Sequence, residues 1–528
     1  MKRLLMVRLS LLGLMFFFGT SLWARPNKKV VVDTLSLVSF NDFHGAFASD
    51  VAAPGAGVLV QTVLNQKMKN ENTVVLSVGD NFSGSYFSRI TRGNPLPEMF
   101  KMMDVKMSAI GNHEFDWGLP YLTDTAAVYM NFVVANIIHS EGEGDCPRWA
   151  QPVCIVNQPL KNGGAVRVAF VGLTTTDTAH KTSPENIKGL SFINPVYAAR
   201  VETACRLKNE GKVDMVVLLM HIGTNMKEKG IIEELNAKRL PFIEGIDAII
   251  SGHSHEVVLA RVNDVPIIQA GFNGSHVGKL NFEVKRKKGR YNISYIGGDT
   301  IAATGVSNPY IDSLVTKVVA DYGLSERLTT SEDLLLHDRK VKKTYTPVGA
   351  YVTAAYAHCF LQDGNLPAGV KALPVFGVNH FGGLRASIPA GEVTRLRAGN
   401  VLPFGGDLVA YYFTGERLKQ LLNDGRKNPN GFLQSSYLEL SLNDEGQIKE
   451  IRDTSTGQLV NDEDNCVVVL DAFITSGGDG YNSALFSGYE IPEFNNRKLE
   501  TTVVLIDYLK GLGNTTISSQ KAPLPVVK

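Results

Sequence analysis

The sequence predicts an α/β protein with at least two large domains, and three observations support this prediction. The chain has 528 residues, more than one hydrophobic core usually fills. In about the first 300 residues, short β-branched runs alternate with helical patterns, which is typical of a layered α/β domain. The pattern changes after Asn308, which indicates a connecting segment and a second domain.

Apolar runs in the N-terminal part are predicted to be buried strands. They span residues 35–40, 73–78, 132–135, 166–173, 215–220, 248–251 and 266–270, and helical patterns lie at 57–69 and 195–209. Polar motifs follow the ends of most of these runs within a few residues. Because open α/β folds bind ligands at the carboxyl ends of their strands, we expect the functional site there.

The second half of the chain begins with a helical pattern at residues 310–322, and a charged segment at 339–343 is predicted to be a surface linker. We therefore predict a signal peptide at residues 1–24, an N-terminal domain at 25–308, a connecting helix and linker at 309–344, and a C-terminal domain at 345–528. The tail from residue 514 onward is polar and contains proline, so we expect a loose chain end.

The N-terminus has the order of a secretory signal. Met-Lys-Arg is followed by an apolar stretch at residues 11–18 and by small residues at 19–24. A membrane anchor is the alternative, but Arg8 interrupts the apolar run and leaves too few residues to span about 30 Å of hydrocarbon. No later segment is long and apolar enough to cross a bilayer. We expect a periplasmic or secreted protein without a stable membrane anchor.

Composition narrows the range of partners. The formal net charge is +1 and 20% of the residues are charged, so no overall field attracts a nucleic acid polymer or anionic lipid. We expect a monomer or a weak dimer. An odd number of cysteines, five, suggests up to two disulfides in an exported protein. Cys146 and Cys154, which flank a short polar loop, are the expected pair.

Potential metal ligands are concentrated in the N-terminal half. They lie in Asp42-Phe-His44, Gly79-Asp80, Gly111-Asn-His-Glu-Phe-Asp116 and Gly252-His-Ser-His255, together with the isolated His221. Each motif alone would indicate an ordinary turn or a buried histidine, but their joint presence in this order indicates a site. Imidazole nitrogen with carboxylate and amide oxygen suits Zn²⁺, Mn²⁺ or similar ions, and two ions can bind if one carboxylate bridges them.

This ordered set resembles the calcineurin-like metallophosphatase superfamily over roughly residues 35–300. The resemblance implies a β-sandwich core flanked by helices, and two divalent metal ions, which could be Zn, Mn or Co. It assigns one ion to Asp42, His44 and His255, the other to Asn112, His221 and His253, and the bridging position to Asp80.

His113 and Asp116 are the candidate catalytic pair. If Asn112 binds metal, the adjacent His113 points elsewhere and is free to meet the substrate. In the resembling superfamily this histidine, oriented by the aspartate, stabilises the transition state or protonates the leaving oxygen, which suits imidazole near neutral pH. The alternative is that Asp116 only caps a helix. The implied reaction is a two-metal hydrolysis of a phosphoester.

Three motifs in the C-terminal half extend the resemblance to the 5′-nucleotidase family. They are Gly382-Gly383-Leu-Arg385, Pro403-Phe404-Gly405-Gly406 and the segment 473–481. The resemblance implies an α+β substrate-binding domain that rotates about the connecting helix to carry the substrate to the metals. It also implies that Phe404 and Phe473 stack on a nucleobase, that Asp479 holds the ribose and that Arg385 clamps the phosphate.

The chain departs from the family pattern at three places. Ser83 stands where the family commonly has glutamine, and either Asn379 or His380 could take the role of a family asparagine. The arginine and glutamate that usually open the second domain are missing at residues 345–351. This loss removes the expected position of one substrate-binding arginine and is compatible with an altered substrate, although Arg385 is present.

The expected function is that of an exported dinuclear-metal phosphohydrolase that releases phosphate from nucleoside 5′-monophosphates, with UDP-sugars as further candidate substrates. One alternative is a 2′,3′-cyclic-nucleotide phosphodiesterase/3′-nucleotidase. Another is a non-catalytic nucleotide-binding protein, against which the intact His113 and Asp116 argue.

Overall fold

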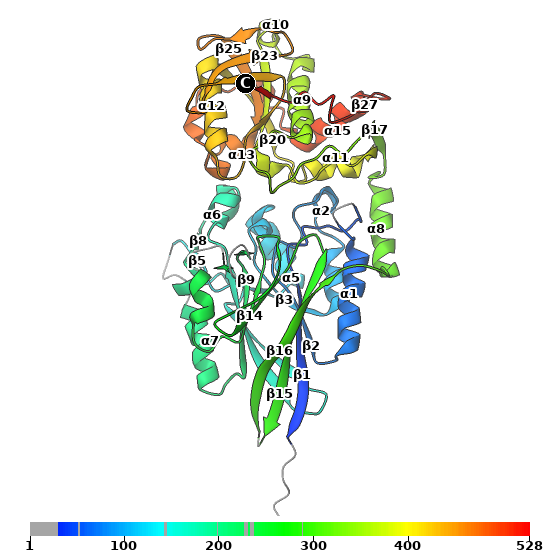
Figure 1. Cartoon of the computed structure of the whole chain (residues 1–528), viewed down its shortest axis with the longest axis vertical. Coiled ribbons are helices and arrows are strands. Elements are labelled where there is room, and N and C mark those ends of the chain that lie inside the picture. Colours follow the sequence, from blue (N-terminus) through cyan, green and yellow to red (C-terminus); the bar gives the residue numbers. More distant parts are fainter. Residues whose placement is uncertain are drawn as a thin grey trace, which may run out of the picture.

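The computed structural model describes residues 30–50, 53–141, 145–197, 199–225, 231–232, 237–287 and 289–528. The predicted signal peptide lies outside these residues. In Figure 1 the N-terminal domain forms the lower half of the molecule and the C-terminal domain the upper half, with helix α8 (Pro309–Asp321) between them at one side. Asn308 caps this helix, because its side chain accepts a hydrogen bond from the Ile311 amide.

Two six-stranded sheets form the N-terminal domain. The first consists of β16 (Arg290–Ala302), β15 (His276–Lys287), β1 (Val31–Phe40), β2 (Thr73–Ser77), β3 (Val105–Ala109) and β4 (Phe132–Val133). The second consists of β13 (Val257–Val262), β14 (Val265–Ala270), β12 (Ala248–Ser251), β9 (Met215–His221), β7 (Ala165–Thr174) and β6 (Val153–Pro159). The central strands β1, β2 and β3 are parallel, and so are β7, β9 and β12.

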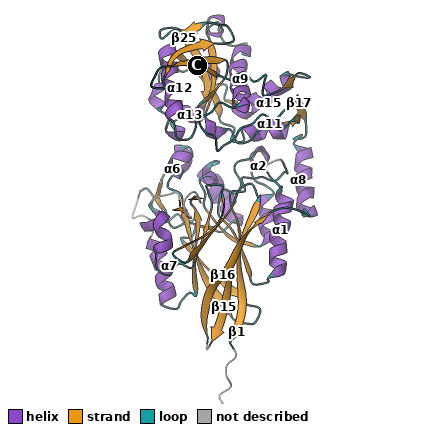
Figure 2. Ribbon diagram, viewed as in Figure 1, coloured by secondary structure: helices purple, strands orange, loops and turns teal. Residues whose placement is uncertain are grey.

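The two sheets pack face to face, and helices cover their outer faces. Leu37, Leu76, Val168 and Val217 share one buried cluster between the sheets. Outside the first sheet lies α1 (Ala56–Lys69), and outside the second lies α7 (Ala199–Asn209), as Figure 2 shows. Helix α3 (Leu96–Met103) packs in the same buried cluster as α1, and α2 (Tyr86–Thr91) lies at the end of the domain that faces the C-terminal domain. Shorter elements are α4 (Gly118–Tyr121), α5 (Ala127–Tyr129), α6 (Thr178–Lys181), β5 (Ile137–His139), β8 (Leu190–Phe192), β10 (Thr224–Asn225) and β11 (Ile231–Ile232). The predicted sandwich flanked by helices is confirmed.

The C-terminal domain combines sheets with helices, as expected for an α+β domain. Its five-stranded sheet contains β21 (Gln434–Ser435), β18 (Val375–Asn379), β25 (Asn465–Asp471), β20 (Asp407–Thr414) and β26 (Leu499–Glu500). Beside it lies a four-stranded sheet of β24 (Leu459–Val460), β23 (Ile448–Asp453), β22 (Leu438–Leu442) and β28 (Val526–Val527). Its helices are α9 (Pro347–Gln362), α10 (Ala368–Lys371), α11 (Arg395–Val401), α12 (Gly415–Lys427), α13 (Ala472–Thr475), α14 (Pro492–Asn495) and α15 (Thr501–Gly511).

Three details differ from the sequence expectations. Strand β17 (Arg327–Ser331) lies in the predicted linker but pairs with β19 (Gly391–Thr394) and β27 (Thr516–Ile517) of the second half. The expected loose tail supplies β27 and β28 to two sheets, so it is part of the domain. The expected Cys146–Cys154 disulfide is wrong for these two described residues, because Cys154 carries a free thiol.

Across the described residues, no helix is long and apolar enough to span a membrane.

Candidate active site

The predicted metal ligands lie where parallel strands end. Asp42 follows β1, Asp80 follows β2 and Asn112 follows β3 of the first sheet. His221 is the last residue of β9 in the second sheet, and the segment with His253 and His255 follows β12. Because the two sheets pack face to face, their carboxyl ends bring residues from 42 to 255 to one edge of the sandwich.

Backbone conformation directs several of these side chains inward. Asp42, His44, Asp80, His253 and His255 all have positive φ angles, between 50° and 75°. Residues other than glycine rarely adopt this left-handed conformation, and its cost must be offset by surrounding contacts. Such strained positions cluster at functional sites, and here five of the seven predicted ligands have them.

The ligand atoms converge. Three groups each offer metal-binding atoms within 4.8 Å of one another: Asp42 with His44 and His255, His44 with Asp80 and His113, and Asp80 with His221 and His253. The Nε2 atom of His221 lies 3.1 Å from Oδ2 of Asp80, and Nε2 of His255 lies 3.3 Å from Oδ1 of Asp42. Two residues are shared between groups: His44 belongs to the first and second, and Asp80 to the second and third.

Backbone carbonyls orient two of the imidazole rings. Nδ1 of His44 lies 2.8 Å from the Ser83 carbonyl, and Nδ1 of His221 lies 2.7 Å from the Val78 carbonyl. A carbonyl only accepts, so Nδ1 donates in both cases, and Nε2 is the ring nitrogen that could bind a metal. Although burial opposes it, the charges of Asp80 and Asp42 raise the pKa of His221 to about 10, so a metal at its Nε2 would have to displace a proton. Burial and the charge of His221 lower the pKa of His253 to about 3, so this imidazole is neutral, as a metal ligand must be.

Buried polar atoms of the cluster fit a metal site. Oδ1 of Asn112, Oδ1 of Asp42 and Nε2 of His221 are buried and form no hydrogen bond of good geometry within the described part of the chain, although the last two lie within ion-pair distance of His255 and Asp80. Burying such atoms unsatisfied is costly. Nitrogen and oxygen donors of this kind suit Zn, Mn or Co, and coordination to such ions would satisfy all three atoms.

Glu114 is a buried support that the sequence analysis did not single out, although it lies in the Gly-Asn-His-Glu motif. Its carboxylate accepts hydrogen bonds from the backbone N–H groups of Asp80, Asn81 and Gly111, each at 2.7 Å. It therefore ties the loop after β2 to the loop after β3. Burial and the charge of Asp80 raise the pKa of Glu114 to about 7.

His113 and Asp116 form the expected pair. Nδ1 of His113 lies 2.8 Å from Oδ2 of Asp116, which also accepts a hydrogen bond from the Ser83 hydroxyl. The His113 backbone N–H donates to Oδ1 of Asp80 at 2.8 Å, which anchors the histidine beside the ligand cluster. Its ring is parallel to that of Phe404, with ring centroids 5.3 Å apart and planes inclined by 4°.

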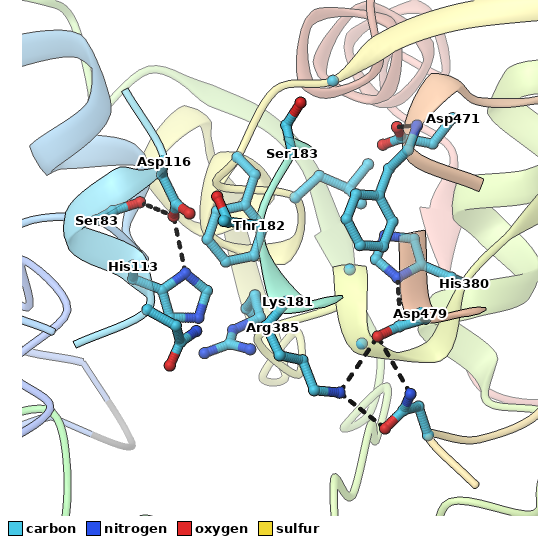
Figure 3. Close-up of a pocket in the computed structure, with 18 of the residues that line it drawn as sticks. Ser83, His113, Asp116, Lys181, Thr182, Ser183, His380, Arg385, Asp471 and Asp479 are labelled. Atoms are coloured by element: carbon cyan, nitrogen blue, oxygen red, sulfur yellow. Dashed lines mark hydrogen bonds and ion pairs between the residues drawn. The ribbon is translucent and has the colours of Figure 1, made fainter. Parts of the chain in front are cut away.

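A cavity of about 330 Å³ opens beside the cluster and is lined by both domains. Figure 3 shows His113, Asp116 and Lys181 of the N-terminal domain facing His380, Arg385, Asp471 and Asp479 of the C-terminal domain. The Arg385 guanidinium lies over the Phe404 ring, 5.3 Å from its centroid. Phe473 stacks on His380 at 4.7 Å, and Oδ2 of Asp479 lies 3.4 Å from Nδ1 of His380. The four predicted substrate residues, Arg385, Phe404, Phe473 and Asp479, therefore share one cavity with the metal-ligand cluster.

Comparisons with known proteins agree with this arrangement. A family model described as calcineurin-like phosphoesterase matches residues 36–257, and one described as 5′-nucleotidase, C-terminal domain, matches residues 327–485. The chain therefore joins a calcineurin-like phosphoesterase domain to a 5′-nucleotidase C-terminal domain. It is a metal-dependent phosphoester hydrolase.

Two relatives of this chain match along most of their length. Over 529 aligned residues the chain is 25% identical to a 5′-nucleotidase of Vibrio cholerae, and the alignment covers 90% of each sequence. Over 501 aligned residues the chain is 24% identical to an apyrase of Tabanus yao, and the alignment covers 85% of this chain and 86% of the apyrase. The crystal structure of a 5′-nucleotidase precursor from Thermus thermophilus superposes with a TM-score of 0.73 at 22% identity, covering 94% of this chain and 99% of that one. This last likeness shows the shared fold.

Arg339 corrects one expectation, because the sequence analysis placed it in a surface linker. It instead lines the cavity, and its Nη1 lies 3.3 Å from Nδ1 of His255. The charge of Arg385, together with burial, lowers the pKa of Arg339 to about 9. Two guanidinium groups that repel each other in one cavity form a site for an anion, which would relieve the repulsion. Arg339 is therefore a candidate for the role of the arginine that is missing from residues 345–351.

His380 and Lys181 complete the cavity wall. Of the two alternatives for the family asparagine, His380 lines the cavity, whereas Asn379 is fully buried and donates to the His380 carbonyl. Lys181 comes from α6, and its Nζ lies 3.3 Å from Oδ1 of Asp479 and 2.9 Å from Oδ1 of Asn430. No sequence motif marks Lys181, because only the folded arrangement of the two domains brings it to Asp479.

Proposed function

We propose that this chain is an exported, two-metal phosphohydrolase that releases phosphate from nucleoside 5′-monophosphates and also accepts UDP-sugars. Its family and its class as a metal-dependent phosphoester hydrolase are the starting point. The proposal adds the number of ions, the substrates and the roles of individual residues. Export is supported by the signal-like order of residues 1–24.

One observation carries the proposal. The cluster of Asp42, His44, Asp80, Asn112, His221, His253 and His255 lies beside the same cavity that Phe404, Phe473, Asp479 and Arg385 line. A nucleotide has an apolar face, a pair of ribose hydroxyls and a phosphate. Aromatic rings, a carboxylate and guanidinium groups bind these three parts respectively. A phosphatase without nucleoside specificity would not need the aromatic pair.

Each group of residues has a distinct task in the proposed hydrolysis. Divalent cations bound by the ligand cluster would lower the pKa of a water molecule and neutralise charge on the phosphoryl oxygens. Arg385 and Arg339 hold the phosphate in the cavity. His113, oriented by Asp116, donates a proton from its imidazole to the departing ribose oxygen. Phe404 and Phe473 hold the base, so that the ester bond is presented to the cluster in one orientation.

The direct test is hydrolysis of a substrate panel, measured as orthophosphate for the 5′-monophosphates and as nucleotide products separated by chromatography for UDP-glucose and 2′,3′-cyclic AMP. Purified protein should be assayed with AMP, GMP, UMP, UDP-glucose and 2′,3′-cyclic AMP, before and after chelation, and with Zn²⁺, Mn²⁺ or Co²⁺ restored. We expect release from the 5′-monophosphates that disappears on chelation and returns with metal. Saturable AMP binding without phosphate release would instead indicate a binding protein.

A 2′,3′-cyclic-nucleotide phosphodiesterase is the second candidate, and Lys181 favours it. Its ammonium group lies next to Asp479, where the ribose hydroxyls would bind. A cationic group at this position would also attract a phosphate attached to the 2′ and 3′ oxygens. Faster hydrolysis of 2′,3′-cyclic AMP than of AMP, reduced by Lys181→Gln, would favour this candidate.

A further inference from the structure

Asp471 is an acidic residue of the cavity wall to which neither the family resemblance nor the proposed reaction gives a role. It ends strand β25, two residues before Phe473, and pairs in the ladder with Leu408, which lies four residues after Phe404. It lines the cavity together with Phe404 and Phe473 and is only 7% exposed. Figure 3 shows it on the side of the cavity away from His113. A base held between the two phenylalanines would therefore present one edge to this carboxylate.

The carboxylate of Asp471 has little to balance its charge. Its Oδ1 accepts a hydrogen bond from the Phe473 backbone N–H at 2.8 Å, which caps the short helix α13. Within the described ranges, no lysine, arginine or histidine forms an ion pair with it. Burial raises the pKa of Asp471 above its usual range, although the charge of His380 opposes this effect. Buried charges are normally paired or fully hydrogen-bonded, so donors from a ligand would complete this site.

The loop after Phe404 makes room for this carboxylate. A Cβ atom at Gly406 would lie 2.5 Å from Oδ1 and 2.7 Å from Oδ2 of Asp471. The backbone N–H of Thr501, another cavity-lining residue, donates to the Gly406 carbonyl at 2.9 Å, which holds the loop against β26. The absence of a side chain at Gly406 thus leaves room for the Asp471 carboxylate in the cavity wall.

We propose that Asp471 determines base specificity and selects guanine nucleotides. This inference rests on the proposed nucleotidase function and adds a base-reading role to it. An ionised carboxylate only accepts hydrogen bonds. Guanine is the common nucleobase whose edge carries two adjacent donors, N1–H and the 2-amino group. Adenine and cytosine offer one donor beside an acceptor, and uracil offers one donor between two carbonyls.

Asp471→Asn tests the proposal, because asparagine caps a helix as well as aspartate does and has the same shape. Its amide carries one acceptor and one donor, which matches xanthine, where a carbonyl replaces the 2-amino group of guanine. Metal-loaded wild-type protein should hydrolyse GMP with a kcat/KM about ten- to a hundredfold above that for XMP or AMP, the range expected for hydrogen bonds to a charged group. In Asp471→Asn the preference for GMP over XMP should disappear or reverse.

The control is Asp479→Asn in the same cavity. It should weaken the binding of all the nucleotides together without changing their ranking, because the ribose is common to them.

Titration calorimetry of guanosine and xanthosine against both variants and the wild type decides the question independently of catalysis. If nothing is hydrolysed but guanosine binds more tightly than xanthosine, and Asp471→Asn removes that difference, the base-reading role stands and the proposed reaction fails. Equal kcat/KM values and equal nucleoside affinities in the wild type, unchanged by Asp471→Asn, would overturn the inference while leaving the nucleotidase proposal intact.

Discussion

Asp80 is the residue on which most contacts of the candidate site depend. Its Oδ1 accepts from the His113 N–H at 2.8 Å, and its Oδ2 lies 3.1 Å from Nε2 of His221 and 3.8 Å from Nε2 of His44. It is thus in contact with both sets of predicted ligands and with the candidate catalytic histidine. Asp42 also contacts both sets, since it lies 3.3 Å from Nε2 of His255 and 3.9 Å from Nε2 of His221, but among the predicted ligands Asp80 is the one whose carboxylate accepts a hydrogen bond from His113.

The first prediction concerns Asp80→Asn. Because a bridging carboxylate serves both ions, this substitution should reduce metal affinity by about a hundredfold or more, beyond the roughly 10–100-fold seen when only supporting residues are changed. The variant His255→Gln, which lacks one outer ligand, should lose one bound ion and retain the other. Metal content by mass spectrometry after gel filtration measures both. Two tightly retained ions in Asp80→Asn would contradict the bridging assignment.

His337 makes stability depend on pH. It is buried, its Nε2 lacks a hydrogen-bond partner in the described structure, and its ring lies 4.4 Å from that of Phe381. Burial, followed by the charges of Arg339 and Arg385, lowers its pKa from 6.5 to about 4. Folding therefore favours the neutral imidazole. Its contribution to stability is complete above about pH 6.5 and is lost as the pH falls toward 4.

The second prediction follows from this direction. His337→Gln should unfold with a weaker acid dependence, because glutamine takes up no proton in the unfolded chain. When the pH falls from about 7 to about 4, the free energy of unfolding of the wild type should drop by about 3 kcal/mol more than that of the variant, since each pKa unit of difference is worth about 1.4 kcal/mol. Differential scanning calorimetry at both pH values measures the change. Parallel shifts of both proteins with pH would refute it.

At the scale of the elements, Glu114 connects two strand ends. Three backbone N–H groups from the loops after β2 and β3 donate to its carboxylate. Those loops also carry Asp80 and Asn112. The geometry of the ligands therefore depends on a carboxylate that binds no metal itself.

The third prediction is that Glu114→Gln weakens metal binding while the fold is kept. The glutamine amide would turn a donor toward backbone donors, which leaves at least one N–H group unsatisfied at a cost of about 1–3 kcal/mol. Metal affinity should fall about 10–100-fold, as for other supporting residues. Competition with a chromogenic chelator measures it. Glu98→Gln, at an exposed position on α3, is the matched control, and equal affinity in both variants would count against this role of Glu114.

Strands and their terminal motifs were accessible from sequence because they depend on local patterns. The runs that became β2, β9 and β12 are mostly apolar, and β1 alternates apolar with polar residues. The polar residues after these runs are typical of strand-end sites. Geometry that depends on distant segments was not accessible. Arg339 opens an ordinary charged stretch, and its place beside His255 depends on how the second domain lies over the first.

Other errors have the same origin. The last residues form strands only because β17 and β22 offer them free edges, and nothing in the tail itself predicts this. Similarly, the left-handed backbone at Asp42 and Asp80 is imposed by the packed strand ends and the hydrogen bonds around them. Residue type alone would have predicted ordinary turns there.

At the scale of the whole molecule, contacts between the domains hold the cavity together. Tyr86 of α2 donates its backbone N–H to Oδ1 of Asn400 at 3.0 Å, and Arg89 forms an ion pair with Glu500. On the other side of the cavity Lys181 contacts Asp479. The predicted metal ligands come from one domain and the proposed base-binding rings from the other. Substrate uptake and product release must therefore loosen at least one of these contacts if the domains rotate during turnover.

The fourth prediction tests this rotation by locking the observed arrangement with a disulfide. A Cβ atom at Gly399 on α11 would lie 2.7 Å from Cβ of Tyr86, so Tyr86→Cys with Gly399→Cys needs the helices to separate by only about 1 Å to reach disulfide geometry. Oxidation should reduce kcat strongly and leave metal content unchanged, because product release requires opening while the ligands lie within one domain. Reduction should restore turnover, and each single cysteine variant should be insensitive to oxidant. Full activity in the oxidised double variant, with the disulfide verified by mass spectrometry, would show that catalysis proceeds without domain movement.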